Sequence, residues 1–246
     1  MPGLKAADEP PEIARRRAAE RRSFSDAEIV EGFFKLTLAA EFRIGGRVDR
    51  IRKYDRPVRV FIDSRAQPDR SAQIAAVIDD IAAKIRHLDI ATTARRKDAN
   101  FIVTLVRDRD LARAIRSLFG TDRARRIQRS LEPQCLSGFR KDSTYRILHS
   151  DVIIVVDAGD LVFYDCAYEE ILQALGPIND DPTVPWSMFN DDVQMGFFGL
   201  YDQYLLNILY HPRVQPGMTR SEVEALLPEI LPAVRAWVAK TNGLPP

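Results

Sequence analysis

The sequence has few of the residues from which metal centres are usually built. Its 246 residues include two cysteines and three histidines. Two cysteines exclude a four-thiolate zinc site, and His87, His149 and His211 are too far apart in the sequence to form a local ligand pair. We therefore expect neither a bound metal ion nor another cofactor.

Long apolar segments are also lacking. No apolar run approaches the roughly 18 residues that a membrane-spanning helix needs, so we expect no transmembrane segment. The first residues contain no apolar stretch of the kind found in secretory signal peptides. We therefore identify no signal peptide in this sequence, which leaves two alternatives open: a cytoplasmic protein, or an exported one whose exporting segment is missing from this sequence.

Charge of either sign is nearly balanced, with 36 lysines and arginines against 35 aspartates and glutamates. A net charge of +1 excludes a field of the whole chain that would attract nucleic acid or an anionic membrane. Hydrophobic residues make up 46% of the chain and charged residues 29%, which is typical of a globular domain with an apolar core.

Local patterns predict an α+β fold with a mixed sheet. Residues 1–23 are charged and contain two adjacent prolines, so we expect a mobile arm followed by a single domain at residues 24–246. Ser25 and Glu28 form a capping box that begins a helix. Strands separated by helices indicate a layered architecture. The predicted strands are 56–63, 100–106, 145–148 and 151–156, and the later helices are 68–88, 110–119 and 160–175.

Residues 107–129 contain eight arginines. A nucleic-acid site would need these on one face together with stacking aromatic side chains. Phe119 is the only aromatic residue in the segment, and aspartates interrupt the charge. We interpret the segment as a solvated helical face and expect no nucleic-acid partner. Contact with an acidic polymer is the alternative.

The residues best suited to chemistry lie between 166 and 192. Glu169 and Gln173 are four residues apart and share one face of the predicted helix, with Glu170 about 100° around its axis. Gly176 is placed to end the helix. Asn179 follows three residues later, where a turning chain can return it toward the helix.

This spacing resembles the zinc-binding helix of the metzincin peptidases, H-E-x-x-H-x-x-G-x-x-H. The chain reads E-E-x-x-Q-x-x-G-x-x-N, with Glu170 at the position of the general base and Glu169, Gln173 and Asn179 at the three histidine positions. Residues 187–190 resemble the methionine turn of that fold. The resemblance implies a zincin-like core around a central helix, and a pseudo-metallopeptidase that has lost its zinc.

A closer resemblance is to a bacterial family known as domain of unknown function 2927. It rests on a cysteine before the E-E-x-x-Q-x-L-G-x-x-N-D helix, an S-x-F-N-D loop and a D-x-x-L-L-x-x-L-Y segment, which begin here at Cys166, Ser187 and Asp202. The chain departs from the expected apolar residue at Pro177. Members of the family usually look exported, so the resemblance implies a periplasmic or secreted protein.

The sequence allows several interpretations of the site. The candidate binding residues are Glu169, Gln173, Asn179, Asp180, Asn190 and Asp191. Carboxylates and asparagines suit a hard cation such as calcium, for which Glu170, Asp181 and Asp192 are further candidates, although no calcium-loop motif is present. Glu170 is the candidate catalytic residue, as a general acid or base. The alternative to catalysis is a structural role, in which these polar side chains satisfy one another's hydrogen bonds and only fix the packing of the helix.

Cys135 and Cys166 stand on either side of the strand that leads into this helix. They can be buried thiols or a disulfide, and the family resemblance together with their placement leads us to predict a bridge. For function, we expect an uncharacterised, non-catalytic domain that acts in binding or cell-envelope processes. The alternative is a metal-independent hydrolase using Glu170. The choice of partner, a protein or an envelope component, is left open.

Overall fold

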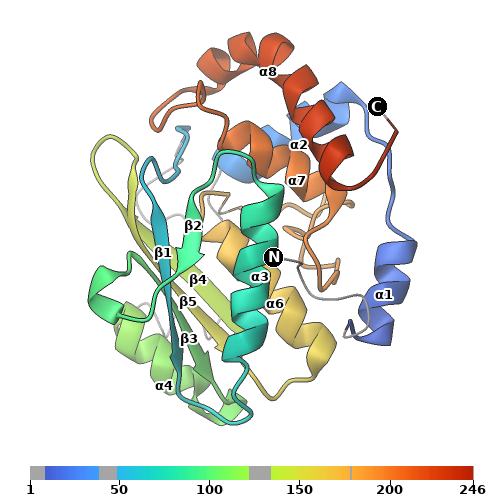
Figure 1. Cartoon of the computed structure of the whole chain (residues 1–246). Coiled ribbons are helices and arrows are strands. Elements are labelled where there is room, and N and C mark those ends of the chain that lie inside the picture. The colour runs from blue at the N-terminus through green and yellow to red at the C-terminus, as the bar shows by residue number, and fades with distance from the viewer. Residues whose placement is uncertain (1–8, 39–48, 122–133, 178, 246) are drawn as a thin grey trace.

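A computed structural model describes residues 9–38, 49–121, 134–177 and 179–245, and it has an α+β fold built on a five-stranded mixed sheet (Figure 1). The strand order is β2-β1-β3-β5-β4. Neighbours are parallel except for β4, which pairs antiparallel with β5 at one edge. The strands are β1 (Val58–Ser64), β2 (Ile90–Thr92), β3 (Phe101–Val106), β4 (Cys135–Lys141) and β5 (Ile147–Val155).

The two faces of the sheet are covered differently because side chains alternate along each strand. Val152 and Ile154 of β5 belong to the main core, which includes α3 (Ser71–Lys84) and α6 (Asp160–Gln173). Ile153 and Val155 point the other way and pack against α4 (Asp108–Phe119) in a second, smaller cluster. The mostly buried helix α6 is therefore held against the larger core, whereas α4 lies alone on the opposite face among the described elements.

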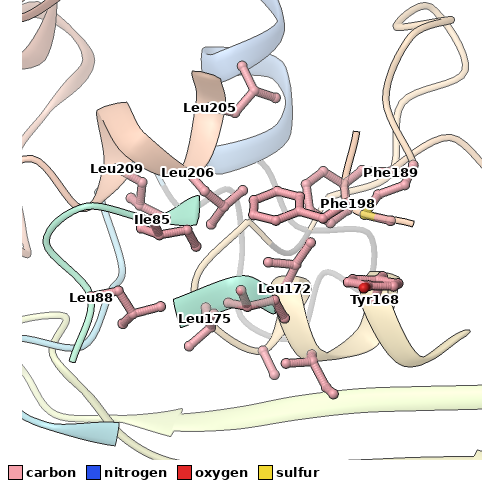
Figure 2. Packing of buried hydrophobic residues seen from close by; sticks show 14 of the residues in the cluster. Ile85, Leu88, Tyr168, Leu172, Leu175, Phe189, Phe198, Leu205, Leu206 and Leu209 are labelled. Atoms are coloured by element: carbon pink, nitrogen blue, oxygen red, sulfur yellow. The ribbon is translucent and has the colours of Figure 1, made fainter. Parts of the chain in front are cut away.

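A helical layer covers α6 on the side away from the sheet. It consists of α2 (Asp26–Leu38), α7 (Leu200–Leu209) and α8 (Arg220–Thr241). Figure 2 shows Leu172 of α6, and Leu175 in the turn just after it, facing Leu206 and Leu209 of α7, with Phe198 beside them. All of these side chains are at most 1% exposed. The central helix is thus enclosed between the sheet and this layer.

The N-terminal segment differs from the predicted mobile arm. Residues 11–18 form the helix α1 (Pro11–Ala18), and its Ile13 is only 2% exposed. The guanidinium of Arg17 lies 4.3 Å from the centre of the Phe197 ring, and a carboxylate oxygen of Glu20 accepts a hydrogen bond from the backbone N–H of Leu200. One apolar residue and long charged side chains that pack by their stems therefore attach residues 11–20 to the domain. Residues 1–8 of the predicted arm lie outside the described residues.

Most predicted elements are present with small shifts at their ends. The capping box is confirmed, since the Ser25 hydroxyl accepts from the Glu28 N–H at 3.2 Å and the Glu28 carboxylate accepts from the Ser25 N–H at 2.8 Å. The two predicted strands at 145–148 and 151–156 form the single strand β5. A short 3-10 helix, η1 (Arg96–Asp98), precedes β3. Within the described residues, no helix is long and apolar enough to span a membrane.

Candidate functional site

The C-terminal end of α6 is held in place by hydrogen bonds from both layers. The carbonyl oxygen of Ala174 accepts from the Ser150 hydroxyl of β5 at 2.8 Å, and that of Leu175 accepts from the Tyr210 hydroxyl at 2.7 Å. Gly176 then turns the chain with a φ of 147°. A Cβ atom there would lie 2.4 Å from the carbonyl oxygen of Arg52, so only glycine fits.

Three carboxylates meet beside the C-terminal part of α6, which carries one of them, Glu169. Single oxygens of Glu169, Asp180 and Asp191 all lie within 4.8 Å of one another. Glu169 and Asp180 are half-buried, and Asp191 is exposed. Burial, followed by the charges of Glu170 and Asp180, raises the pKa of Glu169 well above its usual value. A proton on Glu169 or a bound cation would relieve this repulsion. This group, the carboxylate cluster, contains no histidine or cysteine.

Gln173 joins the cluster to the edge strand of the sheet. Its Nε2 donates to Asp180 Oδ1 at 2.7 Å, and its Oε1 accepts a longer hydrogen bond from the Ser137 hydroxyl of β4 at 3.4 Å. Gln173 and its neighbour Glu170 are each 7% exposed. The amide of Gln173 therefore has a fixed orientation, with its NH₂ group turned toward a carboxylate and its oxygen turned toward a hydroxyl.

Asn179 does not return toward α6. Its Nδ2 donates to the carbonyl oxygen of Lys35 at 2.9 Å, and its backbone N–H donates to that of Leu36 at 3.3 Å. Asn179 therefore attaches the loop to α2, and the next residue, Asp180, reaches Glu169 and Gln173 instead. The reason is the open carbonyls at the end of α2, which accept the hydrogen bonds of Asn179.

Asn190 shapes the loop but is not one of the three clustered residues. Its Nδ2 donates to the carbonyl oxygens of Pro182 and Val184, both at 3.3 Å, and its Oδ1 accepts from the backbone N–H of Asp192 at 3.0 Å. These bonds close residues 182–192 into a compact loop that presents Asp191. Neither Asp181 nor Asp192 belongs to the carboxylate cluster.

A buried aspartate anchors the turn at residues 187–189 to α7. Asp202 is 0% exposed and accepts hydrogen bonds from the Ser187 hydroxyl at 2.6 Å and from the Met188 N–H at 3.1 Å. The Ser187 oxygen in turn accepts from the Phe189 N–H at 3.0 Å. Burial raises the pKa of Asp202 to about 7. The turn at residues 187–189 is therefore held by a buried carboxyl group whose pKa is about 7.

Two features of the structure, one beside the site and one away from it, were not predicted. Asp165 accepts hydrogen bonds from the N–H groups of Met195 at 2.6 Å and Gly196 at 3.0 Å, and its charge contributes to the raised pKa of Glu169. Its position four residues before Glu169 on the same helix face is a usable sequence signal. The contact between His87 and His211, with ring centres 5.9 Å apart, joins separate elements and had no sequence signal.

The predicted bridge between Cys135 and Cys166 is confirmed, with a Cα–Cα distance of 5.8 Å. It links the first residue of β4 to the middle of α6, three residues before Glu169. Disulfides persist in oxidising compartments and are rare in the cytosol of most organisms. The bridge therefore favours a location outside the reducing cytoplasm.

The raised pKa values predict that the folded state loses stability as the pH rises from about 5 to about 7. In this range Asp202, whose pKa is about 7, holds a proton in the folded chain, whereas unfolded carboxyl groups, with pKa values near 4, have released theirs. The raised pKa of Glu169 acts in the same direction. His87, which is exposed, and His211, which is half-buried, have lowered pKa values that oppose this trend. We expect the melting temperature to fall by several degrees, since about 1 kcal/mol corresponds to roughly 2–4 °C at this size.

Melting curves across this range, recorded without divalent cations, check the expectation. The Asp202→Asn variant is the control, because it removes one of the two titrating groups and should show a smaller fall with pH. A melting temperature that rises toward pH 7 would contradict the assignment of protonated carboxyls to the folded state.

The comparisons with known proteins place residues 26–229 within one family. The profile that matches there is described as "Protein of unknown function (DUF2927)". No curated protein and no solved structure matches the chain.

Proposed function

The chain belongs to the DUF2927 family of proteins of unknown function, and from that premise we propose that it is a catalytically degenerate zincin-like domain that acts by binding. The proposed binding site is the carboxylate cluster of Glu169, Asp180 and Asp191. The proposed location is the periplasm or the exterior of the cell, with a role in envelope processes. The disulfide supports that location.

The layout of the domain supports the zincin-like part of the proposal. A mixed sheet packs against one central helix, which carries the E-E-x-x-Q frame and ends at the glycine turn of Gly176. The turn at residues 187–189 is hydrogen-bonded to Asp202 of α7, a helix that follows it in the sequence. These are the parts that the sequence resemblance leads us to expect in a zincin-like core.

The observation that best supports a non-catalytic function is that the three residues at the zinc-ligand positions of the metzincin pattern do not converge. Glu169 and Gln173 share a face of α6, but Asn179 is bonded to the backbone of α2. Gln173 is itself engaged by Asp180 and Ser137. A catalytic zinc ion needs three good protein ligands and one open position. Neutral amides that already bind other groups do not supply them.

The ligand that the cluster suits is a hard cation, with calcium as the type case. Its donors are carboxylate oxygens only, and calcium binds six to eight oxygens from carboxylates, carbonyls and water. Two half-buried carboxylates and one exposed carboxylate give such an ion partial enclosure and an open side. Binding would also remove the repulsion that raises the pKa of Glu169.

We expect calcium at millimolar concentration to raise the melting temperature, because a ligand that binds only the folded state stabilises it. The Asp191→Asn variant should lose this rise. Asp192→Asn is the matched control, since Asp192 is an exposed neighbour outside the cluster and should keep the rise. No calcium effect in the unchanged protein, or an equal loss in both variants, would refute the cation site.

Elemental analysis tests the loss of zinc independently of calcium. Protein purified without a metal-affinity tag should contain no stoichiometric zinc. One zinc per chain, together with a peptidase activity that a zinc chelator abolishes, would refute the degenerate-peptidase proposal whatever calcium does.

The alternative function is a metal-independent hydrolase that uses Glu170 as general acid or base. The proximity of Glu169, whose pKa is raised partly by the charge of Glu170, is the feature that favours it. A substrate would have to reach a side chain that is only 7% exposed, which favours the binding proposal. Hydrolysis of any ester, peptide or glycoside that is lost in Glu170→Gln, while the fold is retained, would decide for the enzyme.

A further inference from the structure

Helix α4 carries a stripe of arginines on the face of the sheet opposite to the carboxylate cluster. Its apolar side, Leu111 and Ile115, is buried against β3 and β5. Arg109, Arg113 and Arg116 are spaced by four and three residues, so they follow one line along the helix. Successive guanidinium stems are about 6 and 4.5 Å apart along the axis. All three residues are exposed, and the side chains of Arg109 and Arg113 are 69% and 81% exposed.

The positive charge of this stripe is poorly compensated. One carboxylate, Asp110, lies 3.8 Å from each of Arg107, Arg109 and Arg113. That distance exceeds a hydrogen bond, and one negative charge balances only one of the three arginines. Arg116 forms no ion pair with any residue that the structure describes. The stripe therefore presents net positive charge to the solvent.

Arginines also share a single carboxylate beside β1, the strand next to β3. Phe61 and Asp63 of β1 alternate with Val60, which faces the main core, so they lie on the α4 side of the sheet. The guanidinium of Arg96 lies 5.8 Å from the centre of the Phe61 ring and pairs with Asp63 at 2.8 Å. Arg65 pairs with the same carboxylate. At Asp63, too, one carboxylate is shared by two arginines.

We propose that this arginine face binds an anionic polysaccharide. Repeated, evenly spaced cations fit a polymer with repeated anionic groups. Within the described residues the exposed large hydrophobic side chains are Leu148 and Trp186, and neither lies on α4. The aromatic rings of this face, Phe119 and Phe61, are only partly exposed: Phe119 packs against the smaller cluster and Phe61 lies beneath the guanidinium of Arg96, so neither is presented for stacking on a nucleic-acid base. The apolar side of α4 is buried in the domain, so the helix cannot enter a membrane interface as amphipathic membrane helices do.

Heparin serves as the polysaccharide probe, and uncharged dextran of similar length serves as the negative probe. Binding is measured by titration at salt concentrations between about 50 and 200 mM, over which electrostatic contacts weaken. We expect heparin to bind and the affinity to fall with salt. The triple variant R109Q/R113Q/R116Q should bind about tenfold or more weakly, since three exposed ion contacts add several tenths of a kcal/mol each. Glutamine keeps the helix propensity of arginine.

A matched control separates the stripe from net charge. The variant R15Q/R213Q/R220Q removes the same charge from exposed arginines outside this face, and it should bind heparin almost as tightly as the unchanged protein. An equal loss in both triple variants would overturn the proposal. So would the absence of heparin binding, or tighter binding of a DNA duplex or of vesicles containing anionic phosphatidylglycerol.

Discussion

Replacing Asp202 by alanine is expected to destabilise the protein by about 2–5 kcal/mol. The substitution leaves two buried donors without an acceptor, the Ser187 hydroxyl and the Met188 N–H. Each orphaned donor costs about 1–3 kcal/mol. Urea denaturation near pH 6 measures the change in the free energy of unfolding. The control is Asp192→Ala, which removes an exposed carboxylate from the same loop region and should change stability by less than about 0.5 kcal/mol.

A double-mutant cycle assigns this cost to the proposed contact. Ser187→Ala removes the same hydrogen bond to Asp202 and also the acceptor of the Phe189 N–H, while Asp202 keeps its bond from Met188. The two substitutions should not be additive, because they remove the same hydrogen bond. Strict additivity, or a loss below about 1 kcal/mol for Asp202→Ala, would contradict the buried network.

The same variant should weaken the proposed cation site. Asp202 holds residues 187–189, and Asn190 continues this turn into the loop that presents Asp191. Loosening the turn therefore increases the freedom of Asp191 without removing any carboxylate from the cluster. In Asp202→Ala, the rise of the melting temperature with calcium should be smaller than in the unchanged protein. Stability and binding are thus connected through one buried side chain.

The sequence predicts the central elements well because their signals are local. Alternating and continuous apolar residues predict strands at 100–106 and 151–156, close to β3 (Phe101–Val106) and β5 (Ile147–Val155). The helical period predicts 160–175, close to α6 (Asp160–Gln173). The edge strand β4 has a mixed pattern of burial and is defined by pairing with β5. Such pairing is a long-range property that a local pattern does not contain.

The candidate site was predicted in part for the same reason. Glu169 and Gln173 follow from helix geometry, so the sequence places them on one face of α6. Asn179 points away from the cluster, and Asp180 joins it instead, because Asn179 is hydrogen-bonded to the carbonyl oxygens of Lys35 and Leu36, which are far away in the sequence. The convergence of Asp191 depends on a loop closed by Asn190. The sequence names Asp180 and Asp191 among its candidates, but spacing alone does not show that these two lie beside Glu169 while Asn179 and Asn190 do not.

Removing the disulfide is the second large perturbation, and we expect it to cost roughly 3–4 kcal/mol. The bridge closes a loop with a sequence separation of 31 residues. Breaking it raises the conformational entropy of the unfolded chain, and the chain-entropy relation gives this magnitude for such a loop. Urea denaturation of the Cys135→Ala/Cys166→Ala variant measures the cost. The unchanged protein in reductant should show the same loss, whereas reductant should leave the double variant unaffected.

Hydrogen exchange locates the effect of the missing bridge within the fold. Among the described strands β4 pairs with β5 only, and the bridge ties its first residue to α6. Its amides should therefore exchange faster in the double variant, while the central strands β1 and β3 change less. The hydrogen bond from Ser137 to Gln173 spans the same junction, so its loss should also release the Gln173 amide from its fixed orientation. Equal protection of β4 with and without the bridge would show that packing on α6 alone holds the edge strand.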